Sequence, residues 1–521
     1  MIPYRSILIV GGGTAGWLAA AYLQRVLGRD TQSPVKITLI ESDEIETIGV
    51  GEATVPTIIQ TLRVLDIPEA ALFAKTEATL KNGIRFVGWR HGGGADTDRF
   101  DHPFDVPIGM EGYPTTMHWL NLKQRGLTDA VMCDATVVQT ALMDHNLSPK
   151  LMASPPYEAP IPYGYHLDAT LLAKVLCEVA MARGVQRIIG NVTHVEVDDA
   201  GIKQITLADG SVHQADLYVD CTGFRSLLLE GALQVPWVSF SDTLLCDRAV
   251  ACPVAYDSED APLRSYTTST AKDAGWIWEI DLQSRRGSGY VFSSAFCSDD
   301  QAIATLRQHH GDAAALREPR LIPMRIGHHA RVWEKNCLAL GLASGFIEPL
   351  ESTGIYLVEQ ALQVFVDYLP SPNTRGLCQA RYNEHISELY AELRDFILIH
   401  YTLSQRRDTP FWRAYTQEVK IPDHLANMLE LWEEKVPTTT DLNRRLSLFG
   451  PTNWFFILAG MHHLPRFGSG QPPYIPPEVS AKVLSQIQEY RKVAIAHSPK
   501  MRDYAKKMRG AFGNAPTPAR S

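Results

Sequence analysis

A glycine-rich turn near the start of the chain is the clearest indication of a ligand-binding site in the sequence. Gly11-Gly12-Gly13-Thr14-Ala15-Gly16 stands between a short apolar run and an apolar helical stretch, and Glu41 ends the next apolar run. In a strand–turn–helix of this kind, Gly11 permits the tight turn, Gly13 lets the backbone approach a pyrophosphate, and Gly16 lets helix and strand pack closely. The helix start offers N–H groups for phosphates, and Glu41 would bind ribose hydroxyls. The pattern predicts a dinucleotide site; a glycine turn without a ligand is the alternative.

A second segment bears on which dinucleotide is bound. Leu217–Cys221 is a short apolar run that contains Asp220, and Thr222-Gly223 follows it. This looks like the second strand motif of FAD enzymes of the aromatic-hydroxylase type. Taken alone, the segment is also compatible with an ordinary buried strand before a glycine turn. Together with the glycine-rich turn, it favours FAD over NAD.

The elements that must position these residues alternate between strand and helix at the start of the chain. Strands at 6–10 and 35–40 enclose a helix at 17–27, which is a βαβ unit. We expect an α/β fold: an FAD-binding, Rossmann-like lobe of the aromatic-hydroxylase type with mixed sheets (1–370), fused to a mainly helical substrate-binding lobe (371–509) and a disordered tail (510–521). Further elements are expected as a helix at 168–184, a hairpin at 192–207, antiparallel strands within 264–296, and helices from about 355 to about 508.

Composition excludes several other classes of protein. The 521 residues are 45% hydrophobic and 21% charged, as in an ordinary globular protein. The net charge of −9 disfavours nucleic acid as a partner. Neither a signal peptide nor a transmembrane stretch is evident, so we expect a cytoplasmic protein without a membrane partner. The eight cysteines form no CxxC pair, which predicts thiols and no metal site.

Six segments, in chain order, carry a family resemblance. They are Gly11–Trp17 (GGGTAGW), Gly49–Pro56 (GVGEATVP), Leu80–Trp89 (LKNGIRFVGW), Asp220–Arg225 (DCTGFR), Trp276–Ile280 (WIWEI) and Pro349–Tyr356 (PLESTGIY). The succession resembles the flavin-dependent tryptophan halogenase family and spans residues 6 to about 415. GVGEAT and PLESTGIY are its most specific parts.

The resemblance implies a reaction and the residues that carry it. Reduced FAD, delivered by a separate NAD(P)H-dependent flavin reductase, would react with oxygen and a bound chloride or bromide to give hypohalous acid, which passes to a lysine beside a small aromatic substrate. Lys81 matches that lysine, and Glu351 matches the glutamate that assists attack at the ring. Thr353 and Gly354 match the halide-binding backbone, with Ser352 in the same turn beside the substrate.

Elementary chemistry agrees with the roles of the lysine and the glutamate. A lysine screened from water can donate a strong hydrogen bond to hypohalous acid or form a haloamine. A carboxylate can stabilise the cationic ring and accept its proton. Without the motifs, Lys81 would be interpreted as a solvated turn lysine, and Glu351 as a capping or salt-bridged surface acid.

The resemblance assigns further contacts. Trp276 and Trp278 would separate flavin from substrate, although Asp281 stands where the family has proline; plain core packing is the alternative for both indoles. His102 and Phe104 would stack on the substrate. The residues implied to contact the flavin are Ser42, Ile45, Ile48, Val50, Ala53, Val192, Leu342 and Ile355.

The substrate is inferred from what one segment lacks. Residues 437–456 contain no tyrosine pair and no matching acid to hold the zwitterion of tryptophan, whereas Trp454, Phe455 and Phe456 could form an apolar wall. We therefore favour indole or a simple indole derivative over free tryptophan. An FAD aromatic hydroxylase is a competing interpretation of the chain, as is an FAD-stabilised protein that binds nucleic acid or tRNA. A homodimer stays open.

Overall fold

The chain forms two compact units, each built from three separate stretches. The structure is a computed structural model that describes residues 4–28, 35–44, 51–311, 315–371, 373–442, 448–466 and 475–513. The first unit comprises Met1–Ala78, Leu167–Ser241 and Met324–Ala391, and the second comprises Thr79–His166, Asp242–Pro323 and Glu392–Ser521. The single boundary expected at 370 differs from this division, because strand pairing joins segments that lie far apart in the sequence.

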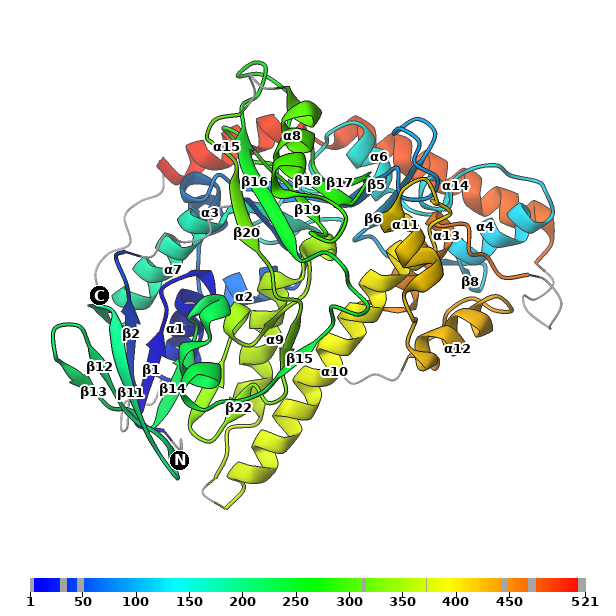
Figure 1. Ribbon diagram of the computed structural model, residues 1–521. Helices are drawn as coiled ribbons and strands as arrows, with labels where there is room; N and C mark the ends of the chain where they lie inside the picture. Colours follow the sequence, from blue (N-terminus) through cyan, green and yellow to red (C-terminus); the bar gives the residue numbers. More distant parts are fainter. Residues whose placement is uncertain are drawn as a thin grey trace. The chain divides into compact units, whose positions relative to one another are not determined.

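A six-stranded sheet organises the first unit (Figure 1). Its order is β10-β2-β1-β14-β23-β22, and all neighbours are parallel except β22 and β23. The central strands are nearly all buried apolar residues, as a sheet covered on both faces requires. The strands are β1 (Ser6–Val10), β2 (Lys36–Glu41), β10 (Gln186–Ile189), β14 (Leu217–Asp220), β22 (Trp333–Glu334) and β23 (Cys337–Ala339).

Helices and small sheets complete the first unit. The helix α1 (Thr14–Leu27) packs against α7 (Ala169–Ala182), whose amino terminus is capped by the Asp168 carboxylate at 3.0 Å from Leu171 N. The remaining helices are α2 (Ile58–Val64), α3 (Glu69–Lys75), α9 (Gly354–Asp367), η1 (Gly223–Arg225), η2 (Leu227–Ala232), η4 (Gly341–Ala343) and η5 (Pro349–Glu351). The other strands are β3 (Gly51–Ala53), β11 (Val192–Asp198), β12 (Gly201–Leu207), β13 (Val212–His213), β15 (Trp237–Ser239), β21 (Gly327–His329) and β24 (Gly345–Phe346).

A seven-stranded mixed sheet forms the centre of the second unit. Its order is β20-β16-β19-β18-β17-β5-β6, and β17 and β5 are its parallel pair. The strands are β5 (Gly83–Val87), β6 (Arg99–Pro103), β16 (Arg248–Val254), β17 (Thr267–Lys272), β18 (Gly275–Asp281), β19 (Arg286–Phe292) and β20 (Arg320–Pro323). The short strands β4 (Thr79–Lys81), β7 (Gly109–Met110) and β8 (Tyr113–Pro114) lie outside this sheet, while β9 (Gly164–Asp168) and α10 (Arg375–Thr402) carry the chain between units.

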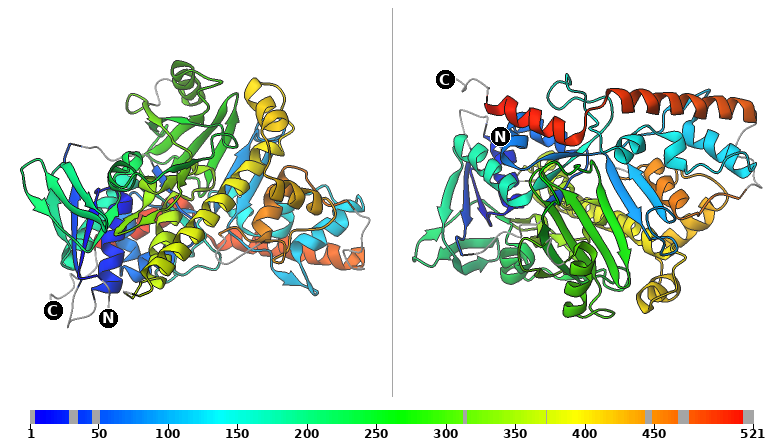
Figure 2. Two further views of the ribbon diagram at one scale, coloured as in Figure 1. Left: turned by 60° about the horizontal axis from the view of Figure 1, so that its bottom comes forward. Right: turned by 90° about the horizontal axis from the view of Figure 1, so that it is seen from above.

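The helices of the second unit come from both the middle and the end of the chain. The long helix α14 (Pro477–His497) packs along α4 (Thr115–Gln124), α5 (Met132–Thr136) and α6 (Gln139–Asp144) (Figures 1 and 2). The other helices are α8 (Asp299–His310), α11 (Pro410–Arg413), η6 (Ala414–Glu418), α12 (Asp423–Trp432), α13 (Pro451–Gly460) and α15 (Met501–Gly513). The carboxyl-terminal helices thus belong to a unit that also contains a large sheet, formed by segments from earlier in the chain.

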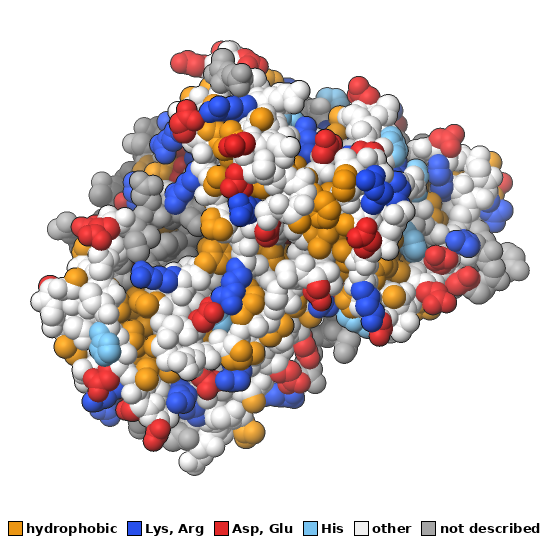
Figure 3. Space-filling model, in the orientation of Figure 1, with side chains coloured by type: hydrophobic (Ala, Val, Ile, Leu, Met, Phe, Trp, Pro, Cys, Tyr) orange, Lys and Arg blue, Asp and Glu red, His pale blue; other side chains and the backbone are white. Residues whose placement is uncertain are grey.

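The structure confirms some of the remaining expectations and corrects others. The fold class is confirmed as mixed α/β with a Rossmann-like parallel sheet. Residues 510–513 are the last turn of α15 and not part of a disordered tail. All eight cysteines are free thiols, and four of them are buried. No helix within the described ranges is long and apolar enough to span a membrane. Acidic and basic side chains are interspersed over the face shown in Figure 3.

Candidate functional site

The glycine turn has the geometry that its residues predict. Gly11 has φ of +112°, and its N–H donates to Ile40 O at 2.8 Å. A Cβ added to Gly16 would lie 1.9 Å from Gly11 O, so only glycine lets the helix start this close to the strand. A Cβ on Gly13 would meet no atom within 4 Å. The backbone at Gly13, the amino cap of α1, therefore borders open space that a ligand's phosphates could fill.

Glu41 lies directly beside the glycine turn. Its Oε2 accepts from Trp17 Nε1 at 3.2 Å, and its Oε1 accepts from Arg187 Nε at 2.5 Å. A Cβ on Gly12 would lie 1.6 Å from this carboxylate, which explains the middle glycine. Each carboxylate oxygen can accept more than one hydrogen bond, so ribose hydroxyls could still bind here.

The neighbouring strand ends complete this edge of the sheet. Val10 is in register with Ile40 on one side and Asp220 on the other. Asp220 is buried, and its carboxylate accepts from the backbone N–H groups of Thr222, Leu228 and Leu229 at 2.8–3.0 Å. Burial raises the pKa of Asp220, while these hydrogen bonds lower it. The carboxylate thus shapes the loop that follows β14.

The flavin contacts inferred from the resemblance lie at separate places in the first unit. Leu342 lies in η4, half-buried, where a Cβ on Gly341 would come within 2.7 Å of Ala15 Cβ. Ile355 is buried in the first turn of α9, and Val192 begins β11 and packs on the core next to β1 and β14. Ser42 accepts a hydrogen bond from Glu44 N, and Ala53 is buried in β3. Ile45, Ile48 and Val50 lie outside the described residues.

The PLESTGIY segment forms a tight turn at the start of α9. Glu351 is 2% exposed, and Ser352 adopts the left-handed conformation with φ of +60°. Thr353 is wholly buried, and its Oγ1 has no hydrogen-bond partner among the described residues. Gly354 is the first residue of the 14-residue helix, and a Cβ there would meet nothing within 4 Å. A helix start, open space and an unsatisfied hydroxyl together suit a small anion.

Lys81 is wholly buried in the second unit. It is paired with Gly164 of β9, and its Nζ lies 5.0 Å from the centre of the Phe104 ring. Lysine is almost never fully buried without partners. A solvated turn lysine, the interpretation of this residue taken without its motif, is therefore wrong.

The residues that adjoin Lys81 are held by a connected set of hydrogen bonds. Asn82 Nδ2 donates to Leu147 O at 3.1 Å and to Ser265 Oγ at 3.0 Å, and its Oδ1 accepts from Gln139 Nε2 at 3.0 Å. Phe104 N donates to Asn82 O. Such support fixes the lysine in place, and neither Asn82 nor Gln139 was identified from the sequence, because their partners are distant along the chain.

A neutral histidine, His166, lies in β9, which pairs with the strand that ends at Lys81. Thr79 Oγ1 donates to Asp281 O at 2.7 Å, so it accepts from His166 Nδ1 at 3.1 Å, while Thr267 Oγ1 donates to His166 Nε2. Burial, with the charge of Lys81 next in size, lowers the pKa of His166 to about 3. The ring therefore adds no second positive charge beside Lys81 at neutral pH.

An aromatic cluster surrounds His102. The imidazole lies 5.7 Å from Phe396, 5.9 Å from Phe449 and 6.1 Å from Phe456, measured between ring centres. Phe396 and Phe449 stack at 3.8 Å. Neither Phe396 nor Phe449 was predicted from the sequence to lie in the site, although both are aromatic.

Asn453 and Trp454 of α13 border this cluster. His102 Nε2 and Asn453 Nδ2 lie 2.9 Å apart, which is a hydrogen bond. Trp454 packs on Phe396 at 5.0 Å, and its buried Nε1 has no hydrogen-bond partner among the described residues. Phe455 is also buried. The structure thus brings His102 and Trp454 to one cluster.

Trp276 and Trp278 share one face of β18, with ring centres 6.4 Å apart. Gly289 on β19 leaves the space that the Trp278 ring occupies, since a Cβ there would lie 2.0 Å from it. Both indoles are buried. The two indoles thus lie side by side in the core, and their role as a barrier stays a prediction.

Asp281 ends the same strand in a buried ion-pair network. Its carboxylate accepts from Arg264 Nη2 at 2.9 Å and from Arg286 Nε at 2.7 Å. Burial alone would raise the pKa of Asp281, but the two guanidiniums hold it below its ordinary value. The aspartate at this position is thus a buried partner for two half-buried arginines.

Comparisons with known proteins agree with this arrangement. A family model described as Tryptophan halogenase matches residues 6–470. Tryptophan 6-halogenase SttH from Streptomyces toxytricini is 35% identical, over 96% of this chain and 97% of its own. The crystal structure of a tryptophan halogenase from Shewanella frigidimarina NCIMB 400 superposes with a TM-score of 0.91 at 32% identity, covering 98% of each chain. Tar14, a tryptophan C-6 flavin-dependent halogenase (chlorinase) from taromycin biosynthesis, gives a TM-score of 0.89 at 36% identity, covering 97% of this chain and all of its own.

Proposed function

The chain belongs to the tryptophan halogenase family, and we propose that it chlorinates or brominates the ring of indole or of a simple indole derivative. It is a flavin-dependent halogenase, an enzyme that uses reduced FAD, oxygen and halide. The observation that carries the proposal is the wholly buried Lys81 with an aromatic ring 5.0 Å from its Nζ.

The first unit would hold the flavin and the halide. The backbone from Gly11 to Gly16 would bind the pyrophosphate, and Glu41 would bind ribose hydroxyls. A separate NAD(P)H-dependent flavin reductase would deliver reduced FAD, which when bound supplies two electrons to convert oxygen and halide to hypohalous acid and water. The N–H groups at Thr353 and Gly354 would hold the halide, because the positive end of the α9 dipole points there.

Lys81 would activate the hypohalous acid. Its ammonium would donate a hydrogen bond to the hydroxyl oxygen, which draws electrons from the oxygen–halogen bond. The ring carbon then takes the halogen, and the hydroxyl leaves as water with a proton from Lys81. The cationic ring loses its own proton, which Glu351 would accept in the role that the family resemblance gives it.

The aromatic cluster supports an indole-type substrate. His102, Phe396, Phe449 and Trp454 offer flat, apolar surfaces, on which an electron-rich ring packs well. Holding a zwitterion there without partners would cost a few kcal/mol, on the order of 2–7.

The acidic residue of segment 437–456 already accepts hydrogen bonds from neighbouring groups. Within the described parts of that segment, 437–442 and 448–456, the carboxylate is Asp441. It accepts from Lys435 Nζ at 2.6 Å, from Thr438 N at 2.7 Å and from Trp432 Nε1 at 3.2 Å. Asp441 is therefore poorly placed to hold the ammonium of an amino acid.

Free tryptophan is the second candidate substrate. The names of two similar proteins support it, since SttH is named a tryptophan 6-halogenase and KtzQ a tryptophan 7-halogenase. The two candidates differ in whether the protein must bind an ammonium and a carboxylate.

Product analysis by mass spectrometry tests the proposal. Reactions would contain FAD, a flavin reductase, NADH, and bromide or chloride, with indole, a substituted indole or tryptophan. We expect one added halogen, with faster turnover on the indoles than on tryptophan. A strong preference for tryptophan would overturn the substrate assignment, and a halide-independent added oxygen would indicate an aromatic hydroxylase instead.

A matched pair of lysine variants tests the role of Lys81. Lys150 is also wholly buried in the second unit, with its Nζ 5.3 Å from the centre of the Tyr163 ring. Lys81→Met should abolish ring halogenation while a diffusible trap still detects hypohalous acid, and Lys150→Met, if folded, should retain halogenation. Equal losses in both variants would show that burial of a lysine, and not its place, explains the effect.

A further inference from the structure

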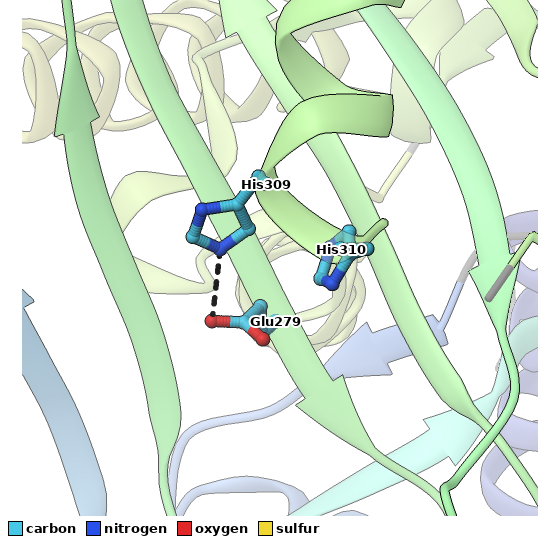
Figure 4. A group of neighbouring side chains, drawn as sticks. All are labelled: Glu279, His309 and His310. Carbon is cyan, nitrogen blue, oxygen red and sulfur yellow. Dashed lines mark hydrogen bonds and ion pairs between the residues drawn. The ribbon is translucent and has the colours of Figure 1, made fainter. Parts of the chain in front are cut away.

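Three side chains with metal-binding atoms converge in the second unit, next to the ion-pair network of Asp281. Glu279 comes from β18, and His309 and His310 are the last two residues of α8 (Figure 4). One potential ligand atom from each side chain lies within 4.8 Å of the other two. The elements are rigid, since Glu279 lies in mid-sheet and α8 packs on β16 and β19.

The distance between Glu279 and His309 fits two ligands of one metal ion better than it fits a hydrogen bond. Glu279 Oε2 and His309 Nε2 lie 3.5 Å apart, which is long for a charge-assisted hydrogen bond. Zinc binds imidazole nitrogen and carboxylate oxygen at about 2.0–2.2 Å, so two such ligands at a tetrahedral angle are separated by about 3.4 Å. The observed separation would therefore change little on binding.

His310 is already oriented by a second hydrogen bond. Ser288 Oγ donates to Trp278 O at 2.7 Å, so it must accept from His310 Nε2 at 2.8 Å. This assigns the proton of the ion-free ring to Nε2, and the neutral imidazole keeps one lone pair. Metal-binding histidines commonly donate their other ring N–H to a fixed acceptor in this way.

The surrounding charges permit a cation. Arg264 Nη2 and Arg286 Nη1 lie 3.1 and 3.3 Å from Glu279 Oε1, on the oxygen that does not approach His309. The same two arginines pair with Asp281, so two positive and two negative charges cancel locally. The Glu279 oxygen beside His309 is thus available to an ion.

We propose that Glu279, His309 and His310 form a binding site for a divalent transition-metal ion, with Zn²⁺ as the best match. Two imidazoles and one carboxylate are typical of zinc and of related first-row metals, whereas Ca²⁺ and Mg²⁺ prefer oxygen ligands. His309 keeps 20% of its side chain exposed, so water can complete the coordination. The ion would tie the end of α8 to the strand that carries Trp276 and Trp278.

Calorimetry with Zn²⁺ and electron paramagnetic resonance with Cu²⁺ test the site, on full-length protein stripped by a chelator and carrying no histidine tag. We expect one ion per chain, nitrogen hyperfine coupling from two imidazoles, and a rise of the melting temperature by about 2–4 °C at saturating Zn²⁺. His309→Ala and His310→Ala should each weaken binding by about tenfold or more.

The control is another histidine that ends a helix. His497 is exposed at the end of α14, and His497→Ala should leave binding unchanged. His309→Gln, which keeps a polar side chain, serves if an alanine variant fails to fold. Absence of Zn²⁺ binding, or binding that survives in the His309→Ala, His310→Ala double variant, would overturn the proposal and leave a Glu279–His309 ion pair alone.

Discussion

Replacing one buried carboxyl group should remove a measurable part of the pH dependence of stability. Glu359 lies in α9, five residues after the Gly354 that begins the helix, and it is 2% exposed. Its Oε2 accepts from Thr57 Oγ1 at 3.0 Å, and its Oε1 has no hydrogen-bond partner among the described residues. Burial raises the pKa of this carboxyl to about 7, against an ordinary value of 4.5. The group is therefore neutral in the folded protein at pH 6.

The sign of the effect follows from proton binding. Between pH 4.5 and 7 the unfolded chain has lost this proton while the folded chain retains it, so the free energy of unfolding falls as the pH rises. The contribution is fully present below pH 4.5 and is lost by pH 7. A difference of about 2.5 pH units, at about 1.4 kcal/mol each, gives a loss of about 3 kcal/mol.

Glutamine cannot titrate, so Glu359→Gln should lack this loss and be more stable than the wild type at pH 8 by up to about 3 kcal/mol. Burial also raises the pKa of Glu52 to about 7, so about half of the slope should remain. Hydrogen exchange of α9 amides, measured by mass spectrometry at pH 5.5 and 8, reports the stability of the first unit. Glu388→Gln, at an exposed position of α10, is the control. An unchanged slope in Glu359→Gln would show that Glu359 does not carry a raised pKa in the folded protein.

Four further substitutions have distinct expected outcomes. Gly13→Ala should fold but lose FAD, and Gly16→Ala should fold poorly, because only the second Cβ meets protein atoms; FAD retention in the first, measured by absorbance, would contradict this. Asp281→Asn should cost about 1–3 kcal/mol in thermal unfolding, because Arg264 and Arg286 lose one of the two buried carboxylates that neutralise them and keep only Glu279; an unchanged melting temperature would argue against it. Thr353→Val should raise the KM for bromide about tenfold without lowering stability; an unchanged KM would show that the hydroxyl does not face the halide.

Local patterns predicted the nucleotide half of the molecule well. The strand at 6–10 and the αβ elements that follow were predicted to within a few residues, because each has a buried apolar run bounded by glycine or a polar turn. The positive φ of Gly11 and the close approach of Gly16 to Gly11 O both lie within one turn, so the glycine motif alone could predict them. Gly12 needed the structure, because the atom that excludes its side chain belongs to Glu41.

Non-local contacts decided what the sequence could not predict. The boundary at 370 failed to describe the units because β14 and β23 pair with β1 and bring distant segments into one sheet. Lys81 resembled a solvated turn residue until its pairing with β9 and its contact with Phe104 were known. The proposed metal-binding group could not be predicted from the sequence either. Glu279 and the two histidines are separated by about thirty residues and form no motif with the spacing of metal ligands.

Asp281 stands where the related family has proline, and its carbonyl and its side chain make separate contacts. A proline there would keep its carbonyl, and the structural link from Thr79 Oγ1 to the carbonyl of residue 281 uses only that group. The link that ties the strand ending at Lys81 to β18 therefore does not use the Asp281 side chain. The side chain, by contrast, neutralises Arg264 and Arg286, which in turn leave one oxygen of Glu279 facing His309. Position 281 therefore supports the strand of Lys81 through its carbonyl and sets the charge balance of the proposed metal site through its side chain.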